Sequence, residues 1–210
     1  QKNREILMHN ELFNENRVYT HNKNISKSIE DRDKDPYTFL EKAFETKNHK
    51  AIGLKLFPDH MRRNSTVHKL FDNVLVDNRI KKIILYRENH LAVCTSMLRS
   101  AVTGHYTHKN LDSTNVSFSA NEFQEFINSY DEYYEYINEN CTNKLNITYE
   151  DLIRDIDGTL RKICDFLGVE YELTETSSKK QSTKTLEESI SNYSELDNTF
   201  AFTRYKKYFV

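Results

Sequence analysis

Glycine, proline and tryptophan are scarce in this sequence of 210 residues, which contains four glycines, two prolines and no tryptophan. The glycines are Gly53, Gly104, Gly158 and Gly168, so none precedes Gly53. A glycine-rich turn that cradles a phosphate group in backbone N–H groups is therefore absent from these residues. No apolar run reaches the roughly 18 residues that a transmembrane helix needs, so we expect no membrane span.

Cysteine is also rare. Cys94, Cys141 and Cys164 are far apart, form no CxxC pair and lack metal-ligand spacing. Cys94 and Cys164 fall on the apolar faces of predicted helices, so we expect buried thiols in a reducing compartment and a cytoplasmic protein. No cluster of His, Cys and carboxylate residues has convincing ligand spacing, so no metal is expected.

The composition indicates a folded protein. Hydrophobic residues make up 37% and charged residues 30%, and 13 tyrosines and 12 phenylalanines must supply much of the core volume. The length fits one domain, residues 1–210. A net charge of -2 argues against nucleic acid as a partner, but it allows a local basic pocket for a small anion.

Short apolar segments alternate with amphipathic ones. Strands are predicted at residues 6–8, 51–57 and 81–86 and in a segment that ends near Tyr149, and helices follow Pro36 and cover residues 90–101. This alternation favours an α/β fold of three layers, in which helices flank a parallel sheet of about four to five strands.

Three further helices carry signals at their ends. Ser119 and Glu122 form a capping-box pattern before the longest helix. The segment "DGTLRKICDFLG" is predicted as a helix with Asp157 as N-cap and Gly168 as its C-terminal stop. The last helix is predicted over "LEESISNYSEL".

Ligands of parallel α/β proteins bind at the carboxyl ends of the strands. Glu11, His60, Arg87 and Tyr149 each follow a predicted strand, so we expect them to converge on one edge. Arg87 also precedes a predicted helix with Asn89 as N-cap, and a guanidinium beside a helix N-terminus is suited to a phosphate. The alternative for Arg87 is a surface arginine paired with Glu88 or Asp59.

The motifs in chain order resemble those of sulfotransferases. "LYRENHLAVCTSMLRSAVTGHY" resembles the element that binds the 3'-phosphate of 3'-phosphoadenosine 5'-phosphosulfate (PAPS), and "IGLKLFPDH" resembles the second strand of the bacterial carbohydrate-type branch. "ITYEDLIRDIDGTLRKICDFLGV" is similar to the tyrosine-bearing strand end with its following helix, and "KKQSTKTLEESISNYSEL" to the C-terminal loop and helix. "HNELFN" resembles the segment that brings an acidic residue to the acceptor.

This resemblance implies a P-loop-kinase-like sulfotransferase fold, a nucleotide-binding site and PAPS as the sulfuryl donor without a metal. It implies Arg87 and Ser96 as ligands of the 3'-phosphate and Tyr149 as a contact near the adenine. Lys180 lies where the C-terminal loop of the family closes over the nucleotide. The alternatives are a core role for Tyr149 and an ordinary solvated charge for Lys180.

Sulfuryl transfer needs in-line positioning and a base for the acceptor hydroxyl. Glu11 matches the acidic position of the family and is assigned as the base, with an ordinary surface carboxylate as the alternative. His60 is the second candidate, because imidazole titrates near neutral pH. His9 and His105 stay open, and Lys55 is a candidate contact for the leaving phosphate.

The 5'-phosphosulfate loop of the family is missing from these residues. We expect the first strand and this loop to lie upstream of Gln1, and the alternative is a relative that has lost catalysis. The predicted function is transfer of a sulfuryl group from PAPS to a hydroxyl of a carbohydrate, lipid or other small acceptor. Alternatives are a non-catalytic nucleotide-binding or scaffold protein and, more remotely, a nucleotide kinase. Residues 20–35 and 104–117 are expected to line the acceptor pocket.

Overall fold

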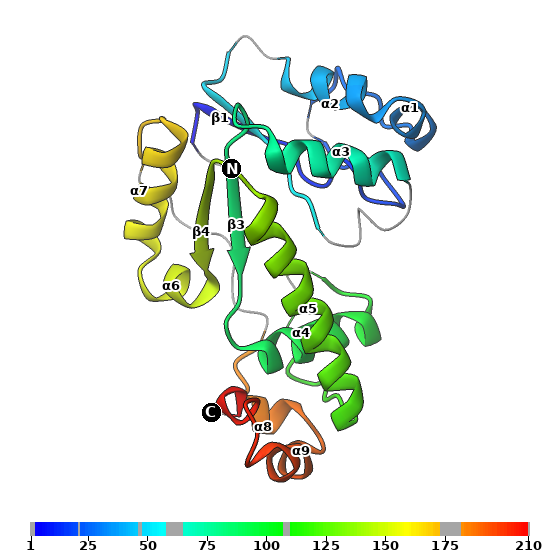
Figure 1. Ribbon diagram of the computed structural model, residues 1–210, viewed down its shortest axis with the longest axis vertical. Helices are drawn as coiled ribbons and strands as arrows, with labels where there is room; N and C mark the ends of the chain where they lie inside the picture. The colour runs from blue at the N-terminus through cyan, green and yellow to red at the C-terminus, as the bar shows by residue number, and fades with distance from the viewer. Residues whose placement is uncertain are drawn as a thin grey trace. The chain divides into compact units, whose positions relative to one another are not determined.

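The strands are short and pair two by two. The computed structural model describes residues 3–20, 22–45, 48–57, 65–106, 110–172 and 182–209 (Figure 1). Within these residues β1 (Ile6–Met8) pairs in parallel with β2 (Ala51–Gly53), and β3 (Lys82–Tyr86) pairs with β4 (Lys144–Thr148), whose arrows point the same way in Figure 1. The described residues therefore form two separate pairs of strands, where the sequence predicted one sheet.

The strand β2 is shorter than the sequence predicted. It ends at Gly53, although Lys55 N–H still donates to Asn10 C=O at 3.0 Å. Its partner β1 also has three residues, and the two strands pair over their whole length. The predicted strand over residues 51–57 therefore covers too many residues.

Helices make up most of the described structure. They are α1 (Ile29–Lys34), α2 (Pro36–Phe44), α3 (Ser65–Val76), α4 (His90–Thr103), α5 (Ala120–Asn140), α6 (Tyr149–Arg154), α7 (Ile156–Leu167), α8 (Leu186–Ser189), α9 (Tyr193–Phe200) and the 3-10 turn η2 (Lys206–Tyr208). The predicted last helix is two helices, because Ser191 N–H donates to Val116 C=O between them. No helix in the described ranges is long and apolar enough to cross a membrane.

The helix ends agree with the predicted signals except at one position. Glu122 N–H donates to Ser119 Oγ at 3.2 Å, and Ser119 N–H donates to Glu122 Oε2 at 2.6 Å, which confirms the capping box of α5. The N-cap of α7 is Asp155 and not Asp157, because Asp155 Oδ1 accepts from Gly158 N–H at 2.9 Å. A Cβ at Gly158 would lie 2.1 Å from Asp155 Oδ2, so a larger residue there would require the Asp155 side chain to move. Gly168 ends α7 at a φ of 77°.

The chain divides into two units, each with its own core. The first consists of Gln1–Leu85, Tyr136–Ile147 and Asp151–Thr174, and the second of Tyr86–Glu135, Thr148–Glu150 and Glu175–Val210. The core of the first unit comprises Leu12, Phe13, Val18, Ile25, Phe39, Leu40, Ala43, Val67 and Leu70. The core of the second comprises Leu91, Cys94, Val116, Phe118, Phe123, Ile127, Ile190, Leu196, Phe200, Tyr208 and Phe209. Phenylalanine and tyrosine supply much of this volume, as the composition predicted.

The three cysteines are free and buried, as predicted. Burial raises the pKa of the Cys94 thiol to about 12, and it raises the pKa of Cys141 and Cys164 as well. These thiols therefore pack as small apolar side chains.

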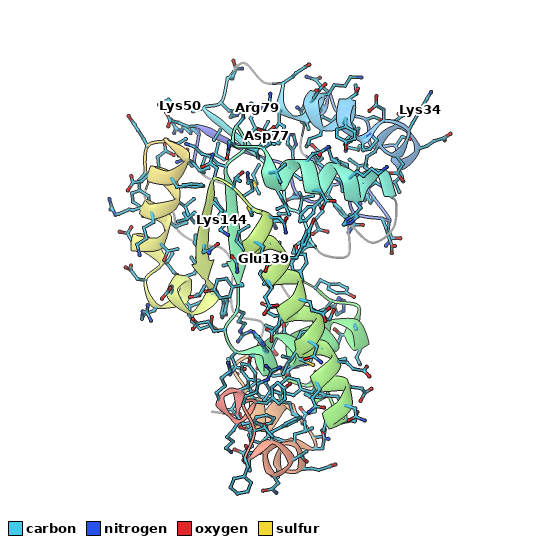
Figure 2. The ribbon with its side chains drawn as sticks, viewed as in Figure 1. Lys34, Lys50, Asp77, Arg79, Glu139 and Lys144 are labelled. Atoms are coloured by element: carbon cyan, nitrogen blue, oxygen red, sulfur yellow. The ribbon has the colours of Figure 1, made fainter. Side chains whose placement is uncertain are left out.

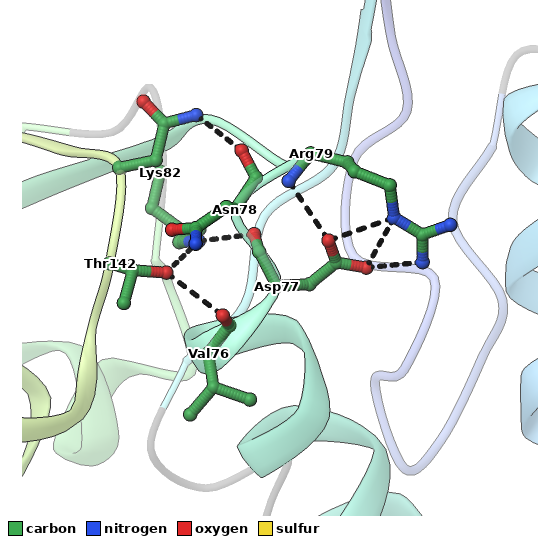
Figure 3. A network of polar contacts seen from close by, with 7 residues as sticks. Val76, Asp77, Asn78, Arg79, Lys82 and Thr142 are labelled. Carbon is green, nitrogen blue, oxygen red and sulfur yellow. Dashed lines mark hydrogen bonds and ion pairs between the residues drawn. The ribbon is translucent and has the colours of Figure 1, made fainter.

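A buried lysine, Lys82, binds the turn before β3 in the first unit (Figure 3). Lys82 is 7% exposed, and its Nζ donates to Asp77 C=O at 2.8 Å. Thr142 Oγ1 lies 3.5 Å from this Nζ and donates to Val76 C=O at 3.0 Å. Beside them the Arg79 guanidinium holds the pKa of the Asp77 carboxyl at about 2 (Figures 2 and 3). Lys82, the first residue of β3, thus fixes the start of the strand that leads to Arg87.

Candidate functional site

The turn between β3 and α4 carries Arg87, the residue that was predicted to bind an anion. Arg87 is the first residue after β3, and Asn89 is the N-cap of α4, as predicted, because its Oδ1 accepts from Ala92 N–H at 3.0 Å. Asn89 Nδ2 donates to the carbonyl of Tyr208 at 3.1 Å, so the C-terminal turn η2 packs against this site. The Asn89 side chain therefore binds both the first turn of α4 and the C-terminal turn η2.

The Arg87 guanidinium is bound along one edge and one face. Its Cζ lies 4.5 Å from the ring centroid of Tyr149, and its Nε lies 3.8 Å from Glu150 Oε1. Tyr149 and Glu150 directly follow β4, the partner of β3, so the carboxyl ends of the two strands bring Arg87 and Tyr149 together. Arg87 Nε is buried without a hydrogen bond, and no hydrogen bond to either Nη atom exists among the described residues.

Glu150 accepts hydrogen bonds from two backbone N–H groups that directly precede α4. Its Oε2 accepts from Glu88 N–H at 3.0 Å and its Oε1 accepts from Asn89 N–H at 3.3 Å. The carboxylate near Arg87 is thus Glu150, which the sequence reasoning missed although it stands beside Tyr149 in "YEDL". The Glu88 and Asn89 N–H groups of this turn are therefore occupied by Glu150, whereas the Arg87 Nη atoms make no hydrogen bond among the described residues.

Tyr130 of α5 contacts the backbone of Arg87. Its hydroxyl accepts from Arg87 N–H at 3.1 Å and donates to Arg87 C=O at 3.4 Å. Burial raises the pKa of this hydroxyl, so it keeps its proton at neutral pH. The sequence indicated Tyr130 only as one apolar position of a helix, and no local signal marks its hydroxyl as part of a site.

The structure gives less information on the other residues that were predicted to bind the nucleotide. Ser96 is exposed on α4, and no hydrogen bond links it to Arg87 among the described residues. Lys180, the predicted ligand of the C-terminal loop, and His60, the second candidate for the base, lie outside the described residues.

Glu11 lies in the first unit on a turn that follows β1. Asn14 Nδ2 donates to Glu11 Oε2 at 2.8 Å, and Tyr19 N–H donates to Glu11 C=O at 3.1 Å. Arg32 of α1, which is 4% exposed, donates to the carbonyls of Leu12 at 3.2 Å and Asn14 at 2.6 Å. A buried guanidinium therefore holds the turn that carries the half-buried Glu11 carboxylate.

The remaining histidine and lysine candidates differ in exposure. His9 is fully buried, and its Nε2 donates to Ala43 C=O at 2.9 Å, because a carbonyl can only accept, while its Nδ1 lies 2.8 Å from Thr20 Oγ1. These contacts give His9 a structural role. Lys55 is exposed beyond the end of β2, and His105 is half-buried after α4.

A pocket of about 330 Å³ opens on the first unit. Its lining residues are Asn24, Ile25, Ser26, Asp31, Lys34, Asp35, Thr38, Phe39 and Lys42. The segment 20–35, which was expected to line the acceptor pocket, supplies most of them. Hydroxyl, amide and charged groups surround two apolar side chains, a mixture suited to a polar ligand with an apolar face.

The comparison with known families decides the assignment. The family model described as "Sulfotransferase domain" matches residues 5–208. The chain belongs to the sulfotransferase family. Membership implies a P-loop-like α/β fold and transfer of a sulfuryl group to a small-molecule acceptor. No curated protein and no solved structure matches this sulfotransferase. Within the described part of the chain, no group of three or more His, Cys, Asp or Glu residues is arranged to hold a metal ion.

Proposed function

We propose that this sulfotransferase uses PAPS as its donor and sulfates a hydroxyl of a carbohydrate, lipid or other small acceptor, as in the bacterial carbohydrate-type branch. The observation that carries the donor assignment is the Arg87 guanidinium, which stacks on Tyr149 at the carboxyl end of β3. Ligand sites of α/β proteins lie at such strand ends.

The residues around Arg87 fit a nucleotide phosphate. The contacts of Arg87 use the Nε edge and one face of the guanidinium, while its Nη atoms make no hydrogen bond among the described residues. Paired Nη donors bind phosphate in a two-pronged geometry. Tyr149 places an aromatic ring beside the same guanidinium, which suits a neighbouring adenine. In this proposal Arg87 and Ser96 bind the 3'-phosphate, Tyr149 contacts the base and Lys180 adds a further cation.

The acceptor side needs a base. Bound PAPS would supply the sulfuryl group and leave as 3'-phosphoadenosine 5'-phosphate (PAP). Glu11 takes the proton of the acceptor hydroxyl as the hydroxyl oxygen bonds to sulfur, with His60 as the second candidate. The buried Arg32 supports this assignment, because it donates hydrogen bonds to the carbonyls of Leu12 and Asn14 in the turn that carries Glu11.

The donor assignment is tested by calorimetric titration of PAP into the protein and into Arg87→Ala. We expect affinity to fall roughly 10- to 100-fold, because a charged, two-pronged phosphate contact is lost. Arg154→Ala, which removes an exposed arginine of α6, is the matched control and should bind like the original protein. Equal PAP affinity of the Arg87→Ala variant and the original protein would refute the assignment.

The base assignment has a separate readout. Glu11→Gln should lower turnover with PAPS by roughly 10²- to 10⁴-fold and leave the affinity for PAP unchanged, because the amide cannot accept the proton. Full turnover by this variant would eliminate Glu11. Arg87-dependent binding of PAP without transfer to any acceptor would favour the non-catalytic nucleotide-binding alternative.

A further inference from the structure

Arg87 sits where a strand stops, so its backbone needs partners outside the ladder. It directly follows β3, and buried or half-buried backbone groups are costly to leave without a hydrogen bond. Tyr130 Oη meets this need for both groups, since it accepts from the N–H at 3.1 Å and donates to the C=O at 3.4 Å. One hydroxyl therefore defines the orientation of the peptide units on either side of the Arg87 Cα.

The Tyr130 ring is itself held by packing. It lies 4.7 Å from the His90 ring, 4.7 Å from the Tyr134 ring and 5.8 Å from the Phe126 ring, measured between centroids. Its helix α5 is anchored in the core of the second unit by Phe123 and Ile127, which are 0% and 1% exposed. The hydroxyl that contacts Arg87 thus extends from a helix that is packed into the core.

We propose that Tyr130 is a positioning residue, which directs the Arg87 guanidinium toward the 3'-phosphate of the nucleotide by fixing the Arg87 backbone. The inference rests on the proposed function, because it takes Arg87 to bind the 3'-phosphate. It assigns no phosphate contact to Tyr130 itself. A binding side chain that is held within about half an ångström of its productive geometry contributes far more to affinity than the same side chain on a loose turn. Glu150 and Tyr149 orient the guanidinium, and Tyr130 fixes the backbone from which it extends.

Tyr130→Phe tests this role, because it removes one oxygen and leaves the ring stack. PAP and adenosine 5'-phosphate, which lacks the 3'-phosphate, are titrated into the protein and its variants. We expect Tyr130→Phe to weaken PAP binding roughly fivefold, because both hydrogen bonds that fix the Arg87 backbone are lost, and to leave adenosine 5'-phosphate binding unchanged. Tyr193→Phe, a half-buried tyrosine of α9, is the control and should change neither affinity.

The double variant separates positioning from a general effect on folding. In the Arg87→Ala background, Tyr130→Phe should cause no further loss of PAP affinity, because the guanidinium that it positions is gone. An equal loss for both nucleotides, or an additive loss in this background, would overturn the inference, and so would unchanged PAP binding by Tyr130→Phe alone. Equal PAP affinity of Arg87→Ala and the original protein would overturn the proposed donor site together with this inference.

Discussion

Phe123→Ala should remove a large part of the stability of the second unit. Phe123 is 0% exposed, and its ring centroid lies 5.6 to 6.0 Å from those of Phe118, Phe200 and Phe209. Truncation of a buried phenylalanine costs about 3–5 kcal/mol, from lost transfer free energy and from the cavity that is left. Because aromatic rings from three segments surround the site, the cavity cannot collapse easily, and we expect a loss of about 4 kcal/mol in the free energy of unfolding.

Phe202→Ala is the matched control, because Phe202 is 103% exposed and belongs to the same unit. It should change the free energy of unfolding by less than about 0.5 kcal/mol. Urea unfolding followed by circular dichroism gives both values, and hydrogen exchange of the α5 amides assigns the loss to the second unit. A loss below about 1 kcal/mol for Phe123→Ala, or equal losses for both variants, would show that Phe123 is not at the centre of this core.

Two further predictions concern titration. Hydrogen bonds from Ser182, Asn110 and Thr183 lower the pKa of Asp112 below its ordinary value of 3.8, so its stabilising contribution is present above about pH 4 and is lost as the pH falls through the lowered pKa. Asp112→Asn should therefore reduce the acid dependence of the melting temperature, and an unchanged profile would contradict this reasoning. Because burial raises the pKa of Cys94 to about 12, a thiol reagent at pH 8 should leave Cys94 unlabelled in the native protein and label it in denaturant, whereas rapid native labelling would show that the thiol is accessible.

Signals that depend on neighbouring residues were predicted well. The capping box at Ser119, the end of α7 at Gly168 and the cap of α4 at Asn89 are all where the sequence indicated. Each is a hydrogen bond or a dihedral preference within about one helical turn, so the chain specifies it locally. The N-cap of α7 shows the limit of such signals. The sequence predicted Asp157, but Asp155 two residues earlier is also a suitable N-cap, and the backbone geometry selects Asp155.

Features that depend on a distant partner were predicted less well. The strands β1 and β2 end together at Met8 and Gly53, and the described strands form two pairs. Which segments pair depends on contacts between parts of the chain that are far apart in sequence. The last predicted helix divides where Ser191 binds Val116, a contact that no helical periodicity reveals.

The candidate site divides in the same way. Arg87 and Tyr149 can be found from the sequence, because the residues that follow a strand lie at its carboxyl end in any parallel α/β arrangement. Tyr130 and Glu150 cannot, since Tyr130 is 43 residues from Arg87 and Glu150 is 62 residues from Glu88. Their contacts exist only because α5 packs beside the end of β3 and β4 pairs with β3, and long-range packing of this kind depends on the whole folded core rather than on local pattern.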